Sequence, residues 1–497
     1  MRIGRNTLIN LAGLGVPLLA AVVAIPPLLH ALGAERFGLL TLVWAVVSYF
    51  GLFDLGLGRV LTQQLAIELA QEQPTRIGVI VGTSMTLMLG LGVLAGLLLA
   101  LGATSGVALI KFVPDPIEAA AAIYAMAIAM PAVVATSGLR GVLEARQAFG
   151  AVNMIRLPMG LFTFLAPLAV VWWAEPRLDL IAWVLTAGRW IAFIAHGVLA
   201  ARSLPTHWPT LAFDAALARP MSASGGWLTV SNIVSPFMGY IDRFLVGVLV
   251  SAAAVAYYAT PLEIAIKLSI VPAALTAVLL PLFAVQMNRG TGESGGLFSQ
   301  SVRVVLGVLW PICVGLVLFS EELVGWWINP AFAAQSAPLL RIFAVGILIN
   351  SLAHVPLTLL QGAGEMQTTA RIHLAELPLF LGLLWSLTAT YGVWGAAIAW
   401  LLRMTSDTLL MFWFALRLLQ PTKVAARMLS SLPVAMLVAV GFGGMLIAAA
   451  PSRLAWLGAT TVTSFLLILR PALRAMHQQQ RQASQRLAAE TPPGAMP

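Results

Sequence analysis

Apolar runs of membrane-spanning length follow one another along almost the whole of this chain. A helix needs about 20 consecutive apolar residues to cross the hydrocarbon core of a bilayer, where it satisfies its own backbone hydrogen bonds. Runs of this length exclude a barrel of short alternating strands. Only 9% of the residues are charged, whereas soluble domains carry roughly 25%. The sequence therefore predicts an all-α polytopic membrane protein.

The apolar runs predict 12–14 transmembrane helices, and we favour 14. The first run is too long for the core of a signal peptide, and a second follows at once, so we interpret it as a membrane helix. The connections are short and leave no room for a soluble domain. The expected spans are 7–30, 37–56, 77–102, 117–139, 154–174, 178–200, 221–248, 255–286, 299–320, 337–361, 369–391, 393–416, 428–450 and 454–470.

Basic residues are distributed unevenly between the two sides that these spans define. Cytoplasmic segments of membrane proteins carry an excess of arginine and lysine, so both termini are expected in the cytoplasm. The same excess of basic residues in cytoplasmic segments explains the formal charge of +9. We therefore expect no nucleic-acid partner. With the N-terminus inside, the outer segments hold only Arg36, Lys111, Arg177, Arg341 and Arg453.

An internal repeat suggests two similar bundles. The segments LEARQAFGAVNMIR (143–156) and LQGAGEMQTTARIH (360–373) occupy equivalent helix-to-helix corners. Two pseudo-repeated bundles with a central cavity and a substrate path between them are a common transporter plan. We expect an N-terminal transmembrane lobe over 1–215, a C-terminal lobe over 216–420, an additional helix pair over 421–472 and a partly disordered basic cytoplasmic tail over 473–497.

Enzyme and metal-site signatures are absent from the sequence. It contains no GxxxxGK[ST] and no HExxH motif, and its six histidines lack metal-ligand spacing. Cys313 is the single cysteine and has no partner for an internal disulfide. We therefore expect no catalytic residue, metal or cofactor, and a function in binding and movement.

Arg189 lies almost at the midpoint of its predicted span, with no acid within four residues. An ionisable residue at the bilayer centre is costly unless it faces water or a partner. Two interpretations remain open. Arg189 either pairs with a distant acid for structural reasons, or it faces a central cavity and is available to an anionic ligand.

Further charges lie within the later spans. Asp242 and Arg243 lie in one span, and Glu263 and Lys267 lie one helical turn apart in the next. We expect these four to form one network. It either locks two helices together or acts as a gate or proton-relay element whose pairing changes between inward and outward states. The eleventh and twelfth spans add Arg371, Glu376, Arg403 and Asp407. This interior set is slightly cationic, and arginine suits phosphate geometry.

The stretch FDLGLGR (53–59) ends the second run. Leu61 stands where a third glycine would complete GxGxxG, so a phosphate-binding loop is not indicated. Its glycines are expected to end the helix, and the amphipathic segment 60–73 is expected to follow on the inner surface. A hinge or inner-gate role for Asp54 and Arg59 is a hypothesis.

Two stretches resemble a known family. Asn6 to Pro17, in the pattern N-x-x-x-N-x-x-x-x-x-x-P, precedes LGAERFGLLTLVWAVVSYFGLFDLGLGRVL (32–61). Together they are similar to the amino-terminal signature of polysaccharide flippases, the Wzx-type members of the multidrug/oligosaccharidyl-lipid/polysaccharide (MOP) exporter superfamily. Residues 241–284 resemble the start of that family's C-terminal lobe. These motifs are hydrophobic and degenerate, so they specify the superfamily better than the substrate.

The resemblance implies translocation of an undecaprenyl-diphosphate-linked oligosaccharide from the cytoplasmic to the periplasmic leaflet of a bacterial inner membrane. It implies alternating access driven by a proton or sodium gradient, with contact to a polysaccharide polymerase and a chain-length regulator. The site residues are assigned from their depth and charge, because the family has no strict motif to carry over. The expected substrate contacts are Arg189, Arg243, Lys267, Arg371 and Arg403. The expected gating or coupling acids are Asp242, Glu263, Glu376 and Asp407.

Of three alternatives, the first stays open and the other two are disfavoured. Lipid-linked peptidoglycan precursor flippases of the same superfamily also have fourteen spans. A multidrug antiporter would need an uncompensated carboxylate deep in one lobe, whereas the N-terminal spans offer only Asp54 and Glu144, both near the inner face. A membrane enzyme would need a long extramembrane loop with catalytic or sugar-binding residues, which the sequence lacks.

Overall fold

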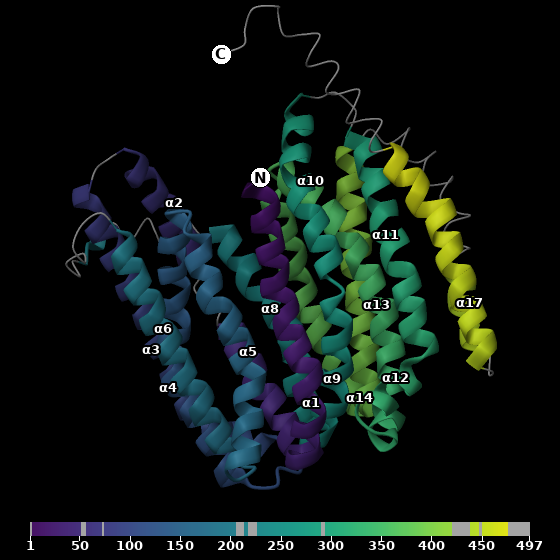
Figure 1. The fold of residues 1–497 in the computed structure, drawn as a ribbon, viewed down its shortest axis with the longest axis horizontal. Helices are drawn as coiled ribbons and strands as arrows, with labels where there is room; N and C mark the ends of the chain where they lie inside the picture. The colour runs from purple at the N-terminus through teal and green to yellow at the C-terminus, as the bar shows by residue number, and fades with distance from the viewer. Residues whose placement is uncertain are drawn as a thin grey trace, which may run out of the picture. The chain divides into compact units, whose positions relative to one another are not determined.

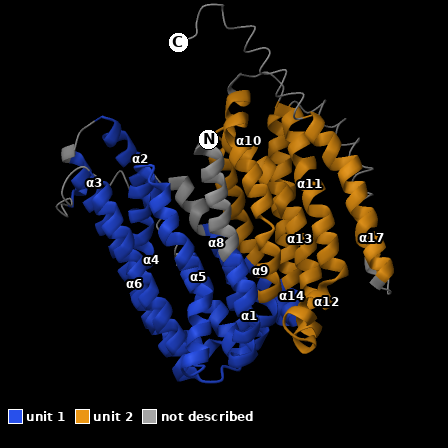
Figure 2. Ribbon diagram, viewed as in Figure 1, with its two compact units in different colours: residues 1–259, 381–396 blue, residues 260–380, 397–497 orange. Residues whose placement is uncertain are grey.

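The computed structural model describes residues 2–50, 56–71, 74–204, 213–216, 226–289, 294–419, 438–446 and 450–475 (Figure 1). These residues separate into two compact units, coloured in Figure 2. Unit 1 comprises Met1–Ala259 with Leu381–Ala396, and unit 2 comprises Thr260–Phe380 with Ala397–Pro497. The sequence-based lobe boundary near residue 215 and the separate pair over 421–472 remain predictions.

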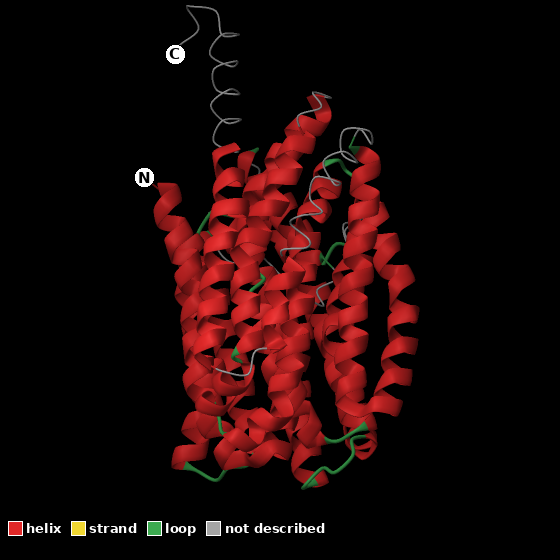
Figure 3. Cartoon of the chain, turned by 90° about the vertical axis from the view of Figure 1, so that its right-hand side faces the viewer, coloured by secondary structure: helices red, strands yellow, loops and turns green. Residues whose placement is uncertain are grey.

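Every regular element in the described part of the chain is helical, which confirms the predicted fold class (Figure 3). The elements up to residue 267 are α1 (Arg2–Phe50), α2 (Leu57–Ala70), α3 (Pro74–Leu109), α4 (Pro116–Ala145), α5 (Phe149–Trp173), α6 (Leu178–Ser203), α8 (Gly226–Leu249) and α9 (Ala252–Lys267). The later elements are α10 (Ile270–Arg289), α11 (Ser294–Leu318), α12 (Ser320–Trp327), α13 (Pro330–Gly362), α14 (Met366–Leu418), the 3₁₀ turn η1 (Gly443–Leu446), α17 (Ala450–Thr463) and the π-helical η2 (Ser464–Leu469).

Ten helical stretches in the described residues are long and apolar enough to cross a membrane. Two of them, α1 and α14, each contain two predicted spans divided by a kink. The kinks lie at Gly33 (φ 73°) and Gly392 (φ 59°), in a backbone region that glycine adopts without a steric penalty. Most of the predicted span 428–450 lies outside the described residues.

The predicted span 255–286 is divided between α9 and α10. The amides of Leu268 and Ser269 bond to carbonyls three residues back, at 3.0 Å each, so the chain tightens before α10 begins. Pro272 follows, and a proline ring clashes with the carbonyl four residues before it. The interruption therefore has a local cause that an apolar run does not reveal.

Small residues let the helices of unit 1 pack closely. A Cβ atom at Gly92 of α3 would lie 2.5 Å from the Cα of Pro131 in α4, and one at Gly96 would lie 2.5 Å from the Ala127 carbonyl oxygen. Such small-xxx-small spacing brings helix backbones together where the surrounding lipid is as apolar as the protein. The contact between α3 and α4 is thus set by these two glycines.

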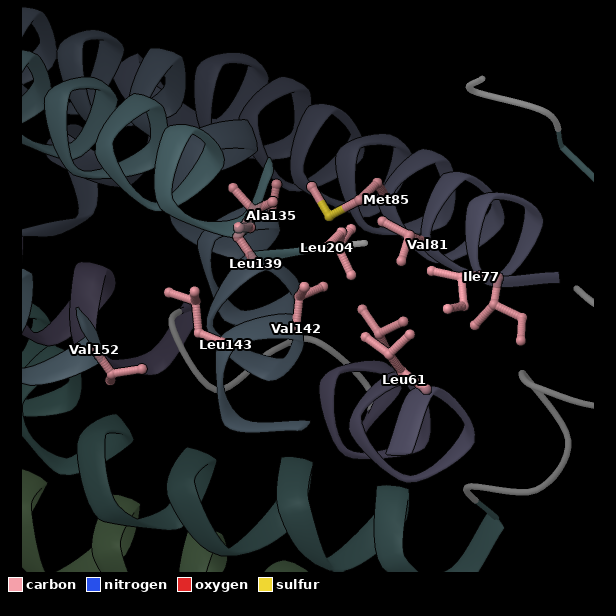
Figure 4. Close-up of a cluster of buried hydrophobic side chains, with 13 residues drawn as sticks. Leu61, Ile77, Val81, Met85, Ala135, Leu139, Val142, Leu143, Val152 and Leu204 are labelled. Atoms are coloured by element: carbon pink, nitrogen blue, oxygen red, sulfur yellow. The ribbon is translucent and has the colours of Figure 1, made fainter. Parts of the chain in front are cut away.

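The amphipathic helix α2 packs against α3 and α4 through one apolar stripe. Leu61 and Leu65 are fully buried in a cluster with Ile77 of α3 and Val142 of α4. Figure 4 shows Leu61 among these side chains. The predicted amphipathic segment therefore exists, beginning at Leu57, and its apolar face covers this end of the α3–α4 pair.

Unit 2 is organised around α13, which packs on α10, α11 and α12. Phe343 of α13 meets Trp400 of α14 edge to face, with ring centroids 5.3 Å apart. On α11, the Gly307 carbonyl accepts a 2.7 Å hydrogen bond from Ser464, at the start of η2. The short helix α12 was not predicted from the sequence, because eight residues are too few for a hydropathy signal.

Candidate functional site

A cavity of about 370 Å³ lies within unit 1, between α1, α4, α5 and α6. Three of its lining side chains are arginines, and no lining residue is acidic. The pocket is therefore suited to an anion. Its polar lining consists of Ser48, Thr136, Ser137, Arg140, Arg156, Thr163, Arg189 and His196.

Arg189 of α6 lies in the cavity wall. Its Nη2 donates a 3.3 Å hydrogen bond to Thr163 Oγ1 of α5, and its Nε is buried without a hydrogen-bond partner. Among the described residues, Arg189 forms no ion pair. The neighbouring Gly188 leaves room for α5, because a Cβ there would lie 2.3 Å from the ring of Phe162. Arg189 thus lines a cavity, and its role as a contact for an anionic ligand stays a prediction.

Arg140, Arg156 and His196 were not predicted as site residues. Arg140 pairs with Glu144 at 3.6 Å, but both side chains are nearly half exposed, so the pair is weak. Arg156 lines the cavity and has no ion-pair partner in the part of the chain that the structure describes. His196 is 5% exposed, and its Nδ1 lies 2.8 Å from the Ala192 carbonyl oxygen.

Sequence reasoning missed the two arginines because they stand at the predicted ends of spans, where the positive-inside rule already accounts for basic residues. The structure extends α4 to Ala145 and begins α5 at Phe149, so both arginines lie within helices. Only the packing of α4, α5 and α6 reveals that they share a cavity with Arg189.

Asp242 and Arg243 of α8 are buried, with exposed fractions of 0% and 3%. The Asp242 carboxylate accepts a 2.7 Å hydrogen bond from the Tyr258 hydroxyl, and Arg243 lies over the ring of Tyr240 at 5.1 Å. These contacts lie within unit 1. Tyr258 is a partner that the charge pattern of the sequence did not predict.

Glu263 and Lys267 form the predicted ion pair, with 3.1 Å between Oε2 and Nζ. They belong to unit 2, whereas Asp242 and Arg243 belong to unit 1. The expected network of all four charges therefore stays a prediction.

A second charged cluster lies in unit 2, on the two segments of α14 that precede and follow the kink at Gly392. His373 Nε2 lies 3.6 Å from Asp407 Oδ1, and Ser406 Oγ donates to Glu376 Oε1 at 3.5 Å. Glu376 and Arg403 are buried, and the Arg403 guanidinium lies 5.2 Å from the centre of the Phe380 ring. The structure thus brings together Glu376, Arg403 and Asp407 from two predicted spans.

Three predicted site residues remain, Arg371, Arg59 and Asp54. Arg371 is exposed on α14, and Arg59 is exposed in the first turn of α2. Asp54 lies outside the described residues. Within the described part of the chain, no group of three or more His, Cys, Asp or Glu residues could hold a metal ion.

Comparisons with known proteins identify the family. A family model described as "Polysaccharide biosynthesis protein" matches residues 3–287. The chain belongs to this family. A Shigella flexneri protein named "Putative O-antigen transporter" is 28% identical over 419 residues, which make up 84% of this chain and 99% of the relative.

Two solved structures show the same fold. An inward-facing multidrug resistance MATE family transporter of the MOP superfamily is 13% identical, with a TM-score of 0.66 over 84% of this chain and 96% of its own. The lipid II flippase MurJ, in an inward closed conformation, is 12% identical, with a TM-score of 0.67 over 94% of this chain and 99% of its own. The family match and the shared fold confirm the resemblance drawn from the sequence. The apolar helices of the described residues make this a multi-pass membrane protein.

Proposed function

We propose that this polysaccharide biosynthesis protein is a flippase for an undecaprenyl-diphosphate-linked oligosaccharide, such as a repeat unit of O-antigen, capsule or exopolysaccharide. It would move this lipid from the cytoplasmic to the periplasmic leaflet of the bacterial inner membrane by alternating access, with both termini cytoplasmic. The name of the Shigella flexneri relative supports this substrate class. We propose no enzymatic activity for this protein.

One observation carries the proposal: Arg140, Arg156 and Arg189 line a single cavity that has no acidic lining residue. A diphosphate offers several oxygens to the planar donor groups of arginine, which bind such anions in pairs of parallel hydrogen bonds. Arg189 has no acidic partner among the described residues, and a partly buried cation without one is unfavourable, so an anionic ligand in the cavity would stabilise it. The buried Nε of Arg189, without a partner, is one donor left for that ligand.

The cluster on α14 is our candidate for ion coupling. Glu376, Asp407 and His373 interact electrostatically in a buried site, and one oxygen each of Glu376 and Asp407 lacks a hydrogen-bond partner. Glu376 is buried and the Asp407 side chain is only 14% exposed. Two carboxylates near each other in such a site repel, and uptake of a proton relieves that repulsion. A proton therefore fits the site directly, and a sodium ion is the other candidate.

The other predicted residues keep their proposed roles. Arg243, Lys267, Arg371 and Arg403 are candidate contacts for the diphosphate or the sugars. The candidate gating residues are Asp242, Glu263, Asp54 and Arg59. Contact with a polysaccharide polymerase and a chain-length regulator is proposed from the family resemblance.

Two other functions within the superfamily compete with this one. The fold of the lipid II flippase MurJ keeps a lipid-linked peptidoglycan precursor open as the substrate. A cation-coupled multidrug antiporter is less favoured, because organic cations would be repelled by the arginines of the cavity.

The test is a flipping assay in proteoliposomes that contain a lipid-diphosphate-linked oligosaccharide. Replacing Arg189→Ala should lower the rate roughly 10- to 100-fold, because each charge-assisted hydrogen bond contributes about 1.5–3 kcal/mol. Arg189→Lys should keep part of the rate. Arg76→Ala is the matched control, since Arg76 is 66% exposed and lies outside the cavity. Full activity of Arg189→Ala would contradict the proposal, and transport of lipid II alone would select the alternative substrate.

A further inference from the structure

A second cavity in unit 1 is almost entirely apolar. It measures about 310 Å³ and lies between α1, α3, α4 and α8. Its wall includes Val46 of α1, Leu98 and Leu109 of α3, and Phe244 of α8. No charged side chain lines it, so the diphosphate proposed for the arginine-lined cavity has no partner here.

Helix α3 creates this pocket with a second pair of glycines. Gly92 and Gly96 are in tight contact with α4, as described above. Gly102 and Gly106 repeat the same spacing, but a Cβ at either position would meet nothing within 4 Å. Both glycines line the pocket. The first pair of glycines therefore brings α3 into contact with α4, whereas the second pair leaves an open pocket beside α3.

The pocket joins an exposed apolar face of α3. Leu98, Leu101 and Leu109 are 62%, 79% and 63% exposed in the isolated chain. In a bilayer these side chains meet lipid hydrocarbon. An apolar pocket does not hold water stably, and an empty one loses dispersion contacts. A hydrocarbon chain from the surrounding membrane is therefore the occupant that matches the lining.

A cation marks one end of the pocket. Lys111 directly follows Ile110, a lining residue, and its backbone is fixed by the Gly247 carbonyl (3.1 Å) and the Ala252 amide (3.0 Å). Its Nζ donates to the Leu249 carbonyl at 2.8 Å. An ammonium has three donors, so two remain. Lys111 is exposed and pairs with no carboxylate among the residues that the structure describes.

We propose that this pocket binds one acyl chain of an anionic phospholipid, whose phosphate meets Lys111. Lys111 lies just beyond the end of a membrane-spanning helix, at the depth where lysines contact lipid headgroups. A single cation matches the single phosphate of a phospholipid, whereas the three arginines of the other cavity match a diphosphate. The proposal does not depend on the substrate that the protein transports.

The experiment uses the full chain in phosphatidylcholine vesicles that contain phosphatidylglycerol with a photoactivatable acyl chain. After illumination, labelled peptides are mapped by mass spectrometry. We expect labelling concentrated on residues 98–110 of the chain. The double variant Gly102→Leu, Gly106→Leu should lower this labelling at least fivefold, because its side chains fill the pocket. Gly90→Leu is the matched control, since Gly90 is an α3 glycine with open space around it and does not line the pocket.

The headgroup contact is tested separately. Lys111→Glu should lower labelling by phosphatidylglycerol, whereas Lys111→Arg should retain it. Equal labelling by a matching phosphatidylcholine probe would overturn the role of Lys111. Labelling spread evenly along α3, or unchanged by the double variant, would overturn the pocket itself. Complete displacement of the probe by undecaprenyl phosphate would assign the pocket to the carrier lipid and overturn the proposal of a phospholipid.

Discussion

The guanidinium of Arg189 in α6 donates to the hydroxyl of Thr163 in α5 at 3.3 Å, and both side chains line the same cavity. The hydroxyl of Thr163 is a neutral acceptor, so this hydrogen bond leaves the positive charge of Arg189 uncompensated. Thr163 therefore orients the arginine without neutralising it.

Thr163→Val should consequently impair flipping less than Arg189→Ala does. This charge-assisted hydrogen bond is long, so its loss is worth about 1.5 kcal/mol, or roughly a tenfold change in rate. The measurement is initial flipping rate in proteoliposomes for the two single variants and the double variant. If Thr163 acts through Arg189, the double variant will be no slower than Arg189→Ala alone. Additive losses would show that Thr163 contacts the substrate independently.

Arg189 could be identified from the sequence because it interrupts a long apolar run, where a charge needs an explanation. Arg140 and Arg156 carry the same chemistry but lie at the ends of runs, where charges are expected. The sequence could therefore find one member of the cavity but not the cavity. Its assembly depends on the lateral packing of α4, α5 and α6, which hydropathy does not encode.

The fold shows the same division between local and distant information. The apolar runs located the membrane helices, since length and hydropathy are local properties. The i,i+4 spacing likewise predicted the Glu263–Lys267 ion pair. The contact between His373 and Asp407 could not be predicted from the sequence. These residues are 34 positions apart and become neighbours only when the two segments of α14, on either side of the Gly392 kink, pack together.

The buried acids of α14 give a prediction about energy coupling. Asp407→Asn and Glu376→Gln each remove a carboxylate that can take up a proton, so both should abolish the acceleration of flipping by an imposed pH gradient. The measurement compares initial rates with and without the gradient. Glu321→Gln is the control in unit 2, because Glu321 is 72% exposed. If both variants still respond to the pH gradient, this cluster is not the proton site. If the unsubstituted protein responds only to a sodium gradient, sodium and not the proton is the coupling ion.

Glu118 is a buried acid that sequence reasoning did not single out, and it gives a prediction about stability. Its Oε2 lies 2.9 Å from Arg36, and its Oε1 accepts from the Leu178 amide, so it links α1, α4 and α6. Glu118→Gln should destabilise the protein by about 2–3 kcal/mol. This is less than the loss for a fully buried pair, because Arg36 is 35% exposed.

Unfolding in mild detergent, followed by circular dichroism, measures that loss. Glu175→Gln provides the comparison, since Glu175 is 73% exposed and its ion pair with Arg177 is a surface contact. Its unfolding midpoint should stay unchanged. Equal midpoints for the Glu118 and Glu175 variants would show that the link between the three helices adds nothing to stability.

The close approach of α3 and α4 gives the last prediction. At Gly96 a Cβ atom would lie 2.5 Å from a backbone oxygen of α4, which cannot move aside as a flexible side chain can. Gly96→Leu should therefore separate the two helices, at a cost of about 1–3 kcal/mol or more, and lower the thermal unfolding midpoint.

Gly90→Leu introduces the same side chain into the same helix where nothing lies within 4 Å. Its midpoint should match that of the unsubstituted protein, and it should rise slightly if the loss of glycine's backbone freedom dominates. A Gly96→Leu protein as stable as Gly90→Leu would mean that α3 and α4 do not pack through this glycine in the membrane.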